Sequence, residues 1–539
     1  MFCNQCEETA KGTGCTVIGV CGKEDATAGL QDVLVYLCKG ISERNVRAYA
    51  AGKADKNAAP FITEALFATL TNTNFDDGKI RELIARARMI RNALPEAGAD
   101  EPSACTWSPK NEADIAAKEQ ELAKDAQIND DIHSLRALLV FGIKGIAAYY
   151  HHARVLGYSD ETIELFIQKG LASTLHDLPA SEMTALVLEC GGVGVTTLAL
   201  LDTANTKTYG DPVISSVRTT VGKRPGILIT GHDLRDLQQL LEQSKEHGID
   251  IYTHGEMLPA HAYPAFKSYP QLVANYGSSW FHQKEEFERF NGPILVTTNC
   301  IVPPKDSYKD RIYTTGPAGF PGVKHIQETE GGKKDFSKII SQAKTCPPPG
   351  ELNPAGRELI TGCAHNAVLS IAGTVIDAVK NGDIRRFVVM AGCDGRQNDR
   401  SYYTGFAGAL PKDTVILTAG CAKYRYNGLD LGTIGGIPRV IDAGQCNDCY
   451  SLVVVAKALA DAFGVGINEL PVSYNIAWYE QKAVLVLLAL LNLGVKNITL
   501  GPRLPGFVSP GVLNVLVENF GIAKNSTIEA DIARMVPAK

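Results

Sequence analysis

Three cysteines stand at matching positions in one stretch of the chain, residues 387–449. Cys393, Cys421 and Cys446 each follow a short apolar run that contains β-branched residues and a glycine. Such runs indicate buried parallel strands. In open α/β sheets, ligands bind beyond the carboxyl ends of the strands. We therefore expect these three thiols to converge on one crevice.

A second group of cysteines lies at the N-terminus. Cys3, Cys6, Cys15 and Cys21 fall within 19 residues that also hold several glycines. Glycine allows a short loop to wrap around a metal and to turn its amides toward sulfur. A tetrahedral zinc site is one interpretation, but zinc ribbons usually carry two CxxC knuckles and this segment has one. The spacing favours an iron–sulfur cluster held by four thiolates.

Potential ligands also follow the predicted strands in the middle of the chain. One run ends at His232, the next leads to Glu256, and a third ends at Cys300. A lone His or Glu at such a position is usually a cap or a paired polar core group. Several in the same topological position indicate a site instead.

Glu480 and Lys482 precede an apolar helix predicted over residues 483–493. Residues two apart on a regular helix point to roughly opposite sides. Either the backbone is irregular there, or only one of the two side chains faces the crevice. The alternative is that Glu480 and Lys482 are ordinary charged residues at the start of a helix and belong to no site.

The periodicity of the chain changes near Pro212. Before it, apolar residues recur at helical spacing from about residue 26 to residue 205, which predicts a bundle. His151 and His152, near one helix end, are interpreted as a partly exposed pair. After it, strands alternate with helices, which implies right-handed parallel crossovers.

The resulting fold class is multidomain α and α/β. We predict a helical-bundle domain over residues 1–215, an α/β domain over 216–350 and a second, similar α/β domain over 351–539. Both α/β domains are expected to be Rossmann-like, with the crevice at their interface. The proline-rich segment that begins at Cys346 supports the second boundary.

Composition limits the classes of partner. The 539 residues carry a net charge of −6 with both signs interspersed, which argues against nucleic acid or an anionic membrane as the main partner. No segment reaches 18 uncharged apolar residues, and the N-terminus lacks a signal-peptide pattern, so we expect a cytoplasmic protein. Fourteen cysteines then point to metal or redox chemistry rather than to disulfides.

Taken together, these residues resemble the hybrid cluster protein family, also called prismane proteins or hydroxylamine reductases. The resemblance runs from the N-terminal cysteine motif to Glu480 and Lys482. It implies that Cys3, Cys6, Cys15 and Cys21 bind a cubane [4Fe–4S] cluster, as in strict anaerobes. A wider spacing accompanies a [2Fe–2S] cluster in other members. The family is also distantly similar to nickel carbon monoxide dehydrogenases.

The resemblance implies a second, hybrid [4Fe–2O–2S] centre. Its ligands would be His232, Glu256, Cys300, Cys393, Cys421, Cys446 and Glu480. Cys393 would carry an extra sulfur as a persulfide, and Lys482 would lie beside the cluster. The chemistry agrees, because thiolates suit soft iron–sulfide units while His and carboxylate suit harder, oxygen-bridged iron. The N-terminal cluster then resembles an electron relay, and the mixed centre a catalyst with Glu256, Glu480, Lys482 and His232 as its catalytic residues.

The resemblance further implies two-electron reduction of hydroxylamine to ammonia and water. Reduction of nitric oxide to nitrous oxide is the second choice of substrate. A different class of function is that of a nitrosative-stress protein, which transfers an NO group to the thiols of partner proteins. The expected partners are a small nitrogenous substrate and an unidentified electron donor protein. We expect a monomer, and residues 432–437 lack the spacing of a dinucleotide fingerprint.

Overall fold

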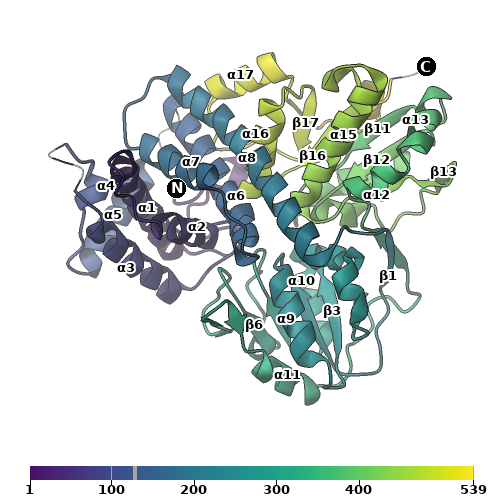
Figure 1. Ribbon diagram of the computed structural model, residues 1–539, viewed down its shortest axis with the longest axis horizontal. Helices are drawn as coiled ribbons and strands as arrows, with labels where there is room; N and C mark the ends of the chain where they lie inside the picture. The colour runs from purple at the N-terminus through teal and green to yellow at the C-terminus, as the bar shows by residue number, and fades with distance from the viewer. Residues whose placement is uncertain (97, 99, 126–129, 538–539) are drawn as a thin grey trace.

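The computed structural model describes residues 1–96, 98, 100–125 and 130–537. The first third is helical, as predicted, and occupies the left and the centre of Figure 1. Asp76 caps α3, since its carboxylate accepts hydrogen bonds from the amides of Gly78 and Lys79. The helices of this part are α1 (Asp25–Ala50), α2 (Ala58–Ala68), α3 (Asp77–Ala93), α4 (Ser103–Thr106), α5 (Glu112–Asp125), α6 (Asp131–Val155), α7 (Glu161–Ser173) and α8 (Ala180–Tyr209).

A six-stranded parallel sheet follows, at the bottom of Figure 1. Its spatial order is β4 (Leu272–Asn275), β3 (Asp250–His254), β2 (Gly226–Thr230), β5 (Ile294–Val296), β6 (Ile312–Thr314) and β7 (Lys324–His325). The accompanying helices are α9 (Leu234–Ser244), α10 (Gln283–Phe290) and α11 (Ser337–Lys344). In chain order the strands run 3-2-1-4-5-6, the Rossmann arrangement.

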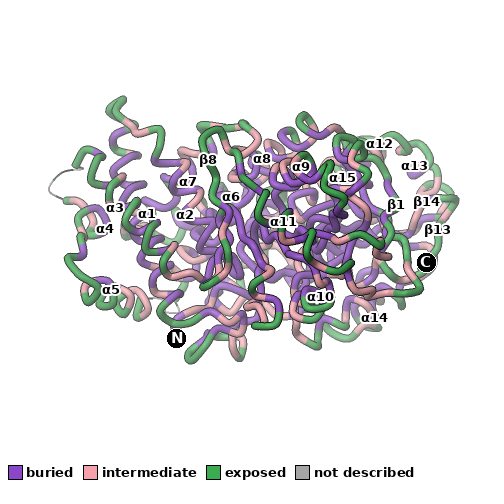
Figure 2. Tube along the Cα trace, turned by 90° about the horizontal axis from the view of Figure 1, so that it is seen from below, coloured by how far each residue is buried: buried purple, intermediate pink, exposed green. Residues whose placement is uncertain are grey.

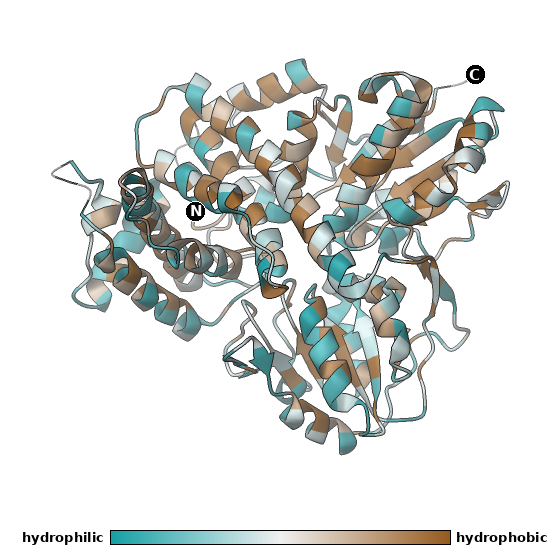
Figure 3. Cartoon of the chain, viewed as in Figure 1, coloured by the Kyte–Doolittle hydropathy of each residue, from teal (hydrophilic) through white to brown (hydrophobic). Residues whose placement is uncertain are grey.

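The last part of the chain repeats this arrangement with a second six-stranded parallel sheet. Its order is β15 (Val440–Asp442), β12 (Thr414–Thr418), β11 (Arg386–Val389), β16 (Val472–Ala477), β17 (Ile498–Gly501) and β18 (Ala523–Lys524). Its helices are α12 (His365–Ser370), α13 (Ala372–Lys380), α14 (Ser401–Ala409), α15 (Cys449–Phe463), α16 (Gln481–Asn492), α17 (Pro510–Phe520) and α18 (Ile528–Met535). Figure 3 shows hydrophobic colour along its central strands. The predicted fold class, a helical part and two Rossmann-like parts, is confirmed.

One apolar segment whose spacing predicts a single helix, residues 364–379, is divided in the structure. Residues 364–379 form α12 and α13, which are separated at Ile371, where the backbone leaves the helical region at φ −112 and ψ 17. Val368 and Val375 both pack inward, so the apolar period of seven continues across the break and hides it in the sequence.

The three parts share contacts near the middle of the molecule. Figure 2 shows the buried segments gathered there, with exposed segments toward the rim. The short strand β1 (Ser215–Arg218) pairs antiparallel with β10 (Glu358–Thr361), so the chain near both predicted boundaries forms one ribbon. The division at residues 215 and 350 stays a prediction.

Helices α6 and α8 are central to this packing. Within the described part of the chain, these two are long and apolar enough to cross a membrane by length and composition. Their most apolar windows are 78% and 39% buried in the protein, and core helices pass the same test. Both pack against α16, whose first turn follows Glu480.

Candidate metal centres

The seven residues predicted to bind the second centre line a single crevice between the two sheets. The space between their atoms amounts to about 430 Å³, part of it continuous with solvent. The lining includes His232, Glu256, Cys300, Cys393, Cys421, Cys446 and Glu480, together with Lys482. The convergence predicted for the three thiols is therefore seen, whereas their role as ligands stays a prediction.

Strand order explains this convergence. In the first sheet, His232 follows β2 and Cys300 follows β5, the two strands between which the order reverses. In the second sheet, Cys393 follows β11 and Glu480 follows β16, at the same topological point. Crevices at such reversals are the usual ligand sites of doubly wound sheets. The strand ends at these two reversal points face each other across the crevice. Residues from both sheets therefore line it.

The loop before Cys393 depends on glycine. Gly392 has a φ of +112°, and a Cβ placed there would lie 2.0 Å from the carbonyl oxygen of Ala477. The close approach lets the amide of Cys393 donate a hydrogen bond to the same carbonyl at 2.7 Å. A side chain at position 392 would push the Cys393 loop away from β16.

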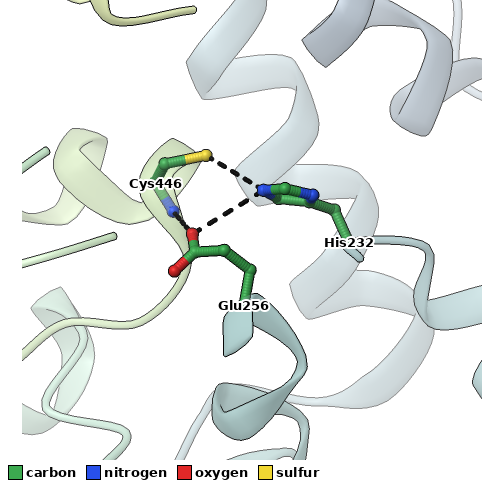
Figure 4. Close-up of side chains that lie close together, drawn as sticks. All are labelled: His232, Glu256 and Cys446. Atoms are coloured by element: carbon green, nitrogen blue, oxygen red, sulfur yellow. Dashed lines mark hydrogen bonds and ion pairs between the residues drawn. The ribbon is translucent and has the colours of Figure 1, made fainter. Parts of the chain in front are cut away.

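His232, Glu256 and Cys446 form the tightest group of donors (Figure 4). Their ligand atoms all lie within 4.8 Å of one another. His232 Nε2 is 3.4 Å from Cys446 Sγ and 3.7 Å from Glu256 Oε2. The other carboxylate oxygen, Glu256 Oε1, is buried and has no hydrogen-bond partner among the described residues. A buried, unpaired carboxylate oxygen beside a thiol and an imidazole fits a metal that completes the group.

Two residues that the sequence did not single out hold this group in place. Thr298 Oγ1 lies 2.9 Å from His232 Nδ1, which leaves Nε2 directed into the crevice. Metal-binding imidazoles commonly donate their second N–H in this way. The Gln445 side-chain amide donates to the carbonyl oxygens of His232 and Glu256, at 3.2 and 2.8 Å. Gln445 thus ties the loop before Cys446 to both donors from the first sheet.

Glu480 and Lys482 both face the crevice, which decides between the two alternatives. Glu480 is the N-cap of α16, with extended backbone angles, and its carboxylate accepts a hydrogen bond from the amide of Lys482 at 2.7 Å. The backbone is therefore irregular at this point. The Lys482 ammonium group donates to His232 Nε2 at 3.1 Å and to Asn299 Oδ1 at 3.0 Å. Asn299, just before Cys300, was not predicted to belong to the site.

Burial sets the charge state of the crevice. It raises the pKa of the Cys300, Cys393, Cys421 and Cys446 thiols, and it raises the pKa of both carboxyl groups. Burial alone would lower the pKa of Lys482, but Cys446, Glu480 and Cys300 around it raise that pKa. A set of buried thiols needs added positive charge to become thiolates. Several metal ions supply that charge, so the donor set and the space fit a cluster.

The N-terminal cysteines form a separate group. Cys3 and Cys15 face each other across a two-residue antiparallel bridge, with the Cys15 amide donating to the Cys3 carbonyl at 2.8 Å. Burial raises the pKa of Cys6 well above its usual value, and the nearby Cys3 and Cys21 add to this effect. All fourteen cysteines lie in the described part of the chain, and all are free. Buried, unbridged thiols in one loop fit a second cluster.

The N-terminal loop packs directly against the residues that precede Lys482. The Glu7 amide donates to the Tyr479 carbonyl at 2.9 Å. The fully buried Arg400 donates to the Glu7 carboxylate at 2.9 Å, to the Trp478 carbonyl at 2.7 Å and to the Cys393 carbonyl at 3.2 Å. The segment that leads to Glu480 and Lys482 therefore lies between the N-terminal loop and the crevice and contacts both.

Comparisons with known proteins agree with this arrangement. The family model described as Prismane/CO dehydrogenase family matches residues 1–533. A protein of Methanosarcina mazei named hydroxylamine reductase is 57% identical, over 99% of each chain. One of Nitratidesulfovibrio vulgaris with the same name is 56% identical over the full length of both. The fold is also similar to carbon monoxide dehydrogenase IV of Carboxydothermus hydrogenoformans, with a TM-score of 0.55 at 16% identity, covering 99% of this chain and 91% of that one. The chain belongs to the Prismane/CO dehydrogenase family.

Proposed function

We propose that this protein is an iron–sulfur hydroxylamine reductase. The reaction is NH2OH + 2 e⁻ + 2 H⁺ → NH3 + H2O. One observation carries the proposal: four thiols, two carboxylates and an imidazole converge on one buried crevice. Over its full length the chain is similar to proteins named hydroxylamine reductase, and this similarity supports the same activity here.

Two cofactors follow from this proposal. Cys3, Cys6, Cys15 and Cys21 hold a [4Fe–4S] cluster that passes electrons. The crevice residues His232, Glu256, Cys300, Cys393, Cys421, Cys446 and Glu480 hold a [4Fe–2O–2S] cluster, with Cys393 as a persulfide. When bound, the mixed cluster supplies iron positions that are not saturated by sulfur and the electrons that cleave the N–O bond.

The protein residues supply charge and orientation. The ammonium group of Lys482 donates to Asn299 Oδ1, and Cys446, Glu480 and Cys300 around it raise its pKa, so it stays positive. A fixed positive charge in a buried site stabilises negative charge that develops on the substrate oxygen. Burial lowers the pKa of His232 far below its usual value, with Lys482 adding to the effect, so the imidazole is neutral and available as a ligand.

The two protons of the reaction come from acidic groups around the crevice. Burial raises the pKa of the Glu256 and Glu480 carboxyl groups in the metal-free protein, whereas a carboxylate that binds iron is ionised. Glu256 Oε1 has no hydrogen-bond partner among the described residues, which fits its proposed role as a ligand. An electron donor protein, which the sequence does not identify, reduces the N-terminal cluster.

Nitric oxide is the second candidate substrate. An apolar cavity adjoins the crevice, and residues such as Leu452, Val455 and Leu459 line it. Such a lining admits a small uncharged molecule more readily than an ion, which favours nitric oxide as well as neutral hydroxylamine.

The test is anaerobic purification followed by iron and sulfide analysis, EPR and turnover with a reduced viologen. We expect two distinct iron–sulfur signals and repeated turnovers of hydroxylamine without a partner protein. Parallel assays measure nitrous oxide from nitric oxide. Absence of multiple turnover with either substrate, in a protein replete with iron and sulfide, contradicts the proposed function.

A further inference from the structure

Two lysines beside the N-terminal loop are buried without a carboxylate partner. Lys23 is 3% exposed and Lys144 is 2% exposed. Among the residues that the structure describes, no carboxylate oxygen lies within 4.0 Å of either ammonium group. By contrast, the buried Lys334 has a carboxylate oxygen of Asp236 at 2.6 Å. A buried charge without a partner is costly, so each of the two lysines calls for an explanation.

Lys144 directs its ammonium group at the N-terminal loop. It lies on α6, which buries more polar side chains than the sequence indicated; the expectation that His152 is partly exposed is wrong, because its side chain is 9% exposed. Lys144 Nζ donates to Gln5 Oε1 at 2.9 Å. Gln5 stands between Cys3 and Cys6 in the sequence, so the positive charge lies beside the predicted cluster loop.

The hydrogen bonds around Gln5 fix the orientation of its amide. Gln5 Oε1 also accepts a bond from Gln481 Nε2 at 2.9 Å, and Gln481 Oε1 in turn accepts one from the Thr71 amide at 3.1 Å. The oxygen of Gln5 therefore faces Lys144. A neutral amide oxygen holds an ammonium group in place without cancelling its charge.

Lys23 is held in the same manner at the other end of the loop. It follows Cys21 by two residues and donates to Gln31 Oε1 at 2.6 Å. Gln31 Nε2 donates to the Asn74 carbonyl oxygen at 2.9 Å, which turns the oxygen of Gln31 toward the lysine. Both ends of the cysteine loop thus have a fixed positive charge that is held by a neutral side chain.

Asp32 is the free carboxyl group of this region, and it cannot balance the lysines. Burial raises its pKa to about 6, while Lys144, Lys23 and Lys39 act to lower it. One carboxyl group therefore lies among three ammonium groups, and it makes an ion pair with none of them at 4.0 Å or less. Positive charge remains in excess beside the loop.

The thiols of the loop are the groups left to balance this charge. The buried carboxylates of the loop, Glu7 and Glu8, each pair with an arginine. Burial raises the pKa of Cys3, and Lys23 acts to lower it. Burial lowers the pKa of Lys144 to about 8, with Asp32 and Cys3 among the groups that oppose this, so Lys144 is mainly an ammonium at neutral pH.

We propose that Lys23 and Lys144 are the counter-charges of the N-terminal iron–sulfur cluster and raise its reduction potential. The inference rests on the [4Fe–4S] cluster of the proposed function. Such a core with four thiolates is an anion, and its reduction by one electron adds one negative charge. Fixed positive charges stabilise the more negative, reduced form, so the cluster accepts an electron more readily. Neither lysine binds iron; each acts through its charge.

The test is a redox titration of the holoenzyme followed by EPR. Lys144→Met removes the charge and keeps an unbranched side chain. Lys144→Arg keeps the charge, and the cavity that Lys144 lines with Asp32 and Lys39 leaves room for the larger group. Lys118→Met is the matched control, since Lys118 is 6% exposed in the same helical part but pairs with Glu121 at 2.6 Å. The potential of the crevice centre in the same sample is the internal reference.

We expect Lys144→Met to lower the equilibrium constant for one-electron reduction of the N-terminal cluster roughly tenfold, a fall of about 59 mV in its midpoint potential. Lys23→Met shifts the potential in the same direction, and the crevice centre shifts less. Lys144→Arg and Lys118→Met keep the wild-type potential. A wild-type potential in iron-replete Lys144→Met overturns the inference, as does an equal fall in Lys144→Arg or in Lys118→Met.

Cluster retention is a second readout. If Lys144→Met and Lys23→Met lose the N-terminal cluster while Lys144→Arg retains it, the role as counter-charges is supported, because only the neutral variants leave the anion unbalanced. Loss from all three variants overturns it. If the wild-type protein holds both clusters but does not reduce hydroxylamine, the proposed function fails while the comparison of potentials still decides the role of the lysines.

Discussion

The amide of Cys446 donates a hydrogen bond to Oε2 of Glu256 at 2.7 Å. A main-chain donor beyond the second sheet thus fixes a carboxylate that comes from the first sheet. The bond leaves Oε1 of Glu256 free in the crevice and holds Cys446 Sγ close to His232. Any change at Glu256 therefore acts on both halves of the site.

We predict that Glu256→Gln loses turnover sharply while the protein folds. The amide keeps the shape of the side chain but removes its negative charge from the metal and its capacity to carry a proton. Loss of one such interaction costs a factor of roughly a hundred to a thousand in rate, about 3–4 kcal/mol. Steady-state hydroxylamine reduction with a viologen donor, normalised to iron, measures it. Wild-type turnover in a metal-replete variant would show that substrate binds elsewhere.

Lys482→Met is expected to cost less than Glu256→Gln. The variant removes a positive charge beside the crevice but no proposed ligand. Asn299 loses one hydrogen bond, at 3.0 Å in the wild type. We expect a loss of roughly tenfold in kcat, consistent with one electrostatic contribution of about 1.4 kcal/mol. The same assay, run side by side on both variants, ranks them, and a larger loss for Lys482→Met refutes the order.

Cys15→Ser should remove the signal of the N-terminal cluster and leave that of the crevice cluster largely intact. The two sets of donors are disjoint, and Cys15 packs with Phe2 and Ala28 rather than against the crevice. Low-temperature EPR of anaerobic protein follows the two signals separately. Loss of both signals in a folded variant is the outcome that excludes two independent centres.

Glu7→Gln should disturb the crevice although Glu7 is no predicted ligand. The variant leaves the buried Arg400 without its carboxylate partner, at 2.9 Å in the wild type. Breaking a buried ion pair by removing one member costs about 3–5 kcal/mol. We expect a lower thermal midpoint and an altered crevice signal, because Arg400 also holds the carbonyls of Cys393 and Trp478. An unchanged midpoint would mean that Arg400 finds another partner.

Cys393 is predicted to carry a persulfide. Mass spectrometry of the gently alkylated protein should find one additional sulfur on the peptide that contains Cys393. The peptide that contains Cys421 serves as the control and should carry none. If reproducible anaerobic preparations lack the additional sulfur, the proposed centre contains no persulfide.

The sequence was most informative where a predicted ligand directly follows a predicted strand. His232, Cys300, Cys393 and Cys421 could be placed because a buried strand fixes where the next residue points, and parallel order then brings strand ends together. Arg400 could not be placed in this way. Helical periodicity shows that a face is buried but not which distant element covers it, and the partner of Arg400 lies 393 positions earlier in the chain.

Asn299 and Thr298 illustrate a second limit. Both stand beside predicted ligands in the sequence, and short polar residues there have many ordinary roles as caps and turns. Their contacts with Lys482 and His232 depend on distances that only the assembled crevice defines. Residues that orient a ligand carry no spacing signal of their own.

The contact between the N-terminal loop and the segment before Lys482 also fixes an order of events during synthesis. Gln5 bonds to Gln481 and Glu8 to Tyr479, pairs separated by 476 and 471 positions. Gln5 and Glu8 therefore leave the ribosome before their partners, by on the order of half a minute or more at roughly 5–20 residues per second. Through that interval the contacts that Tyr479 and Gln481 make with the N-terminal loop cannot form, so this loop reaches its final packing only after residue 481 has been made.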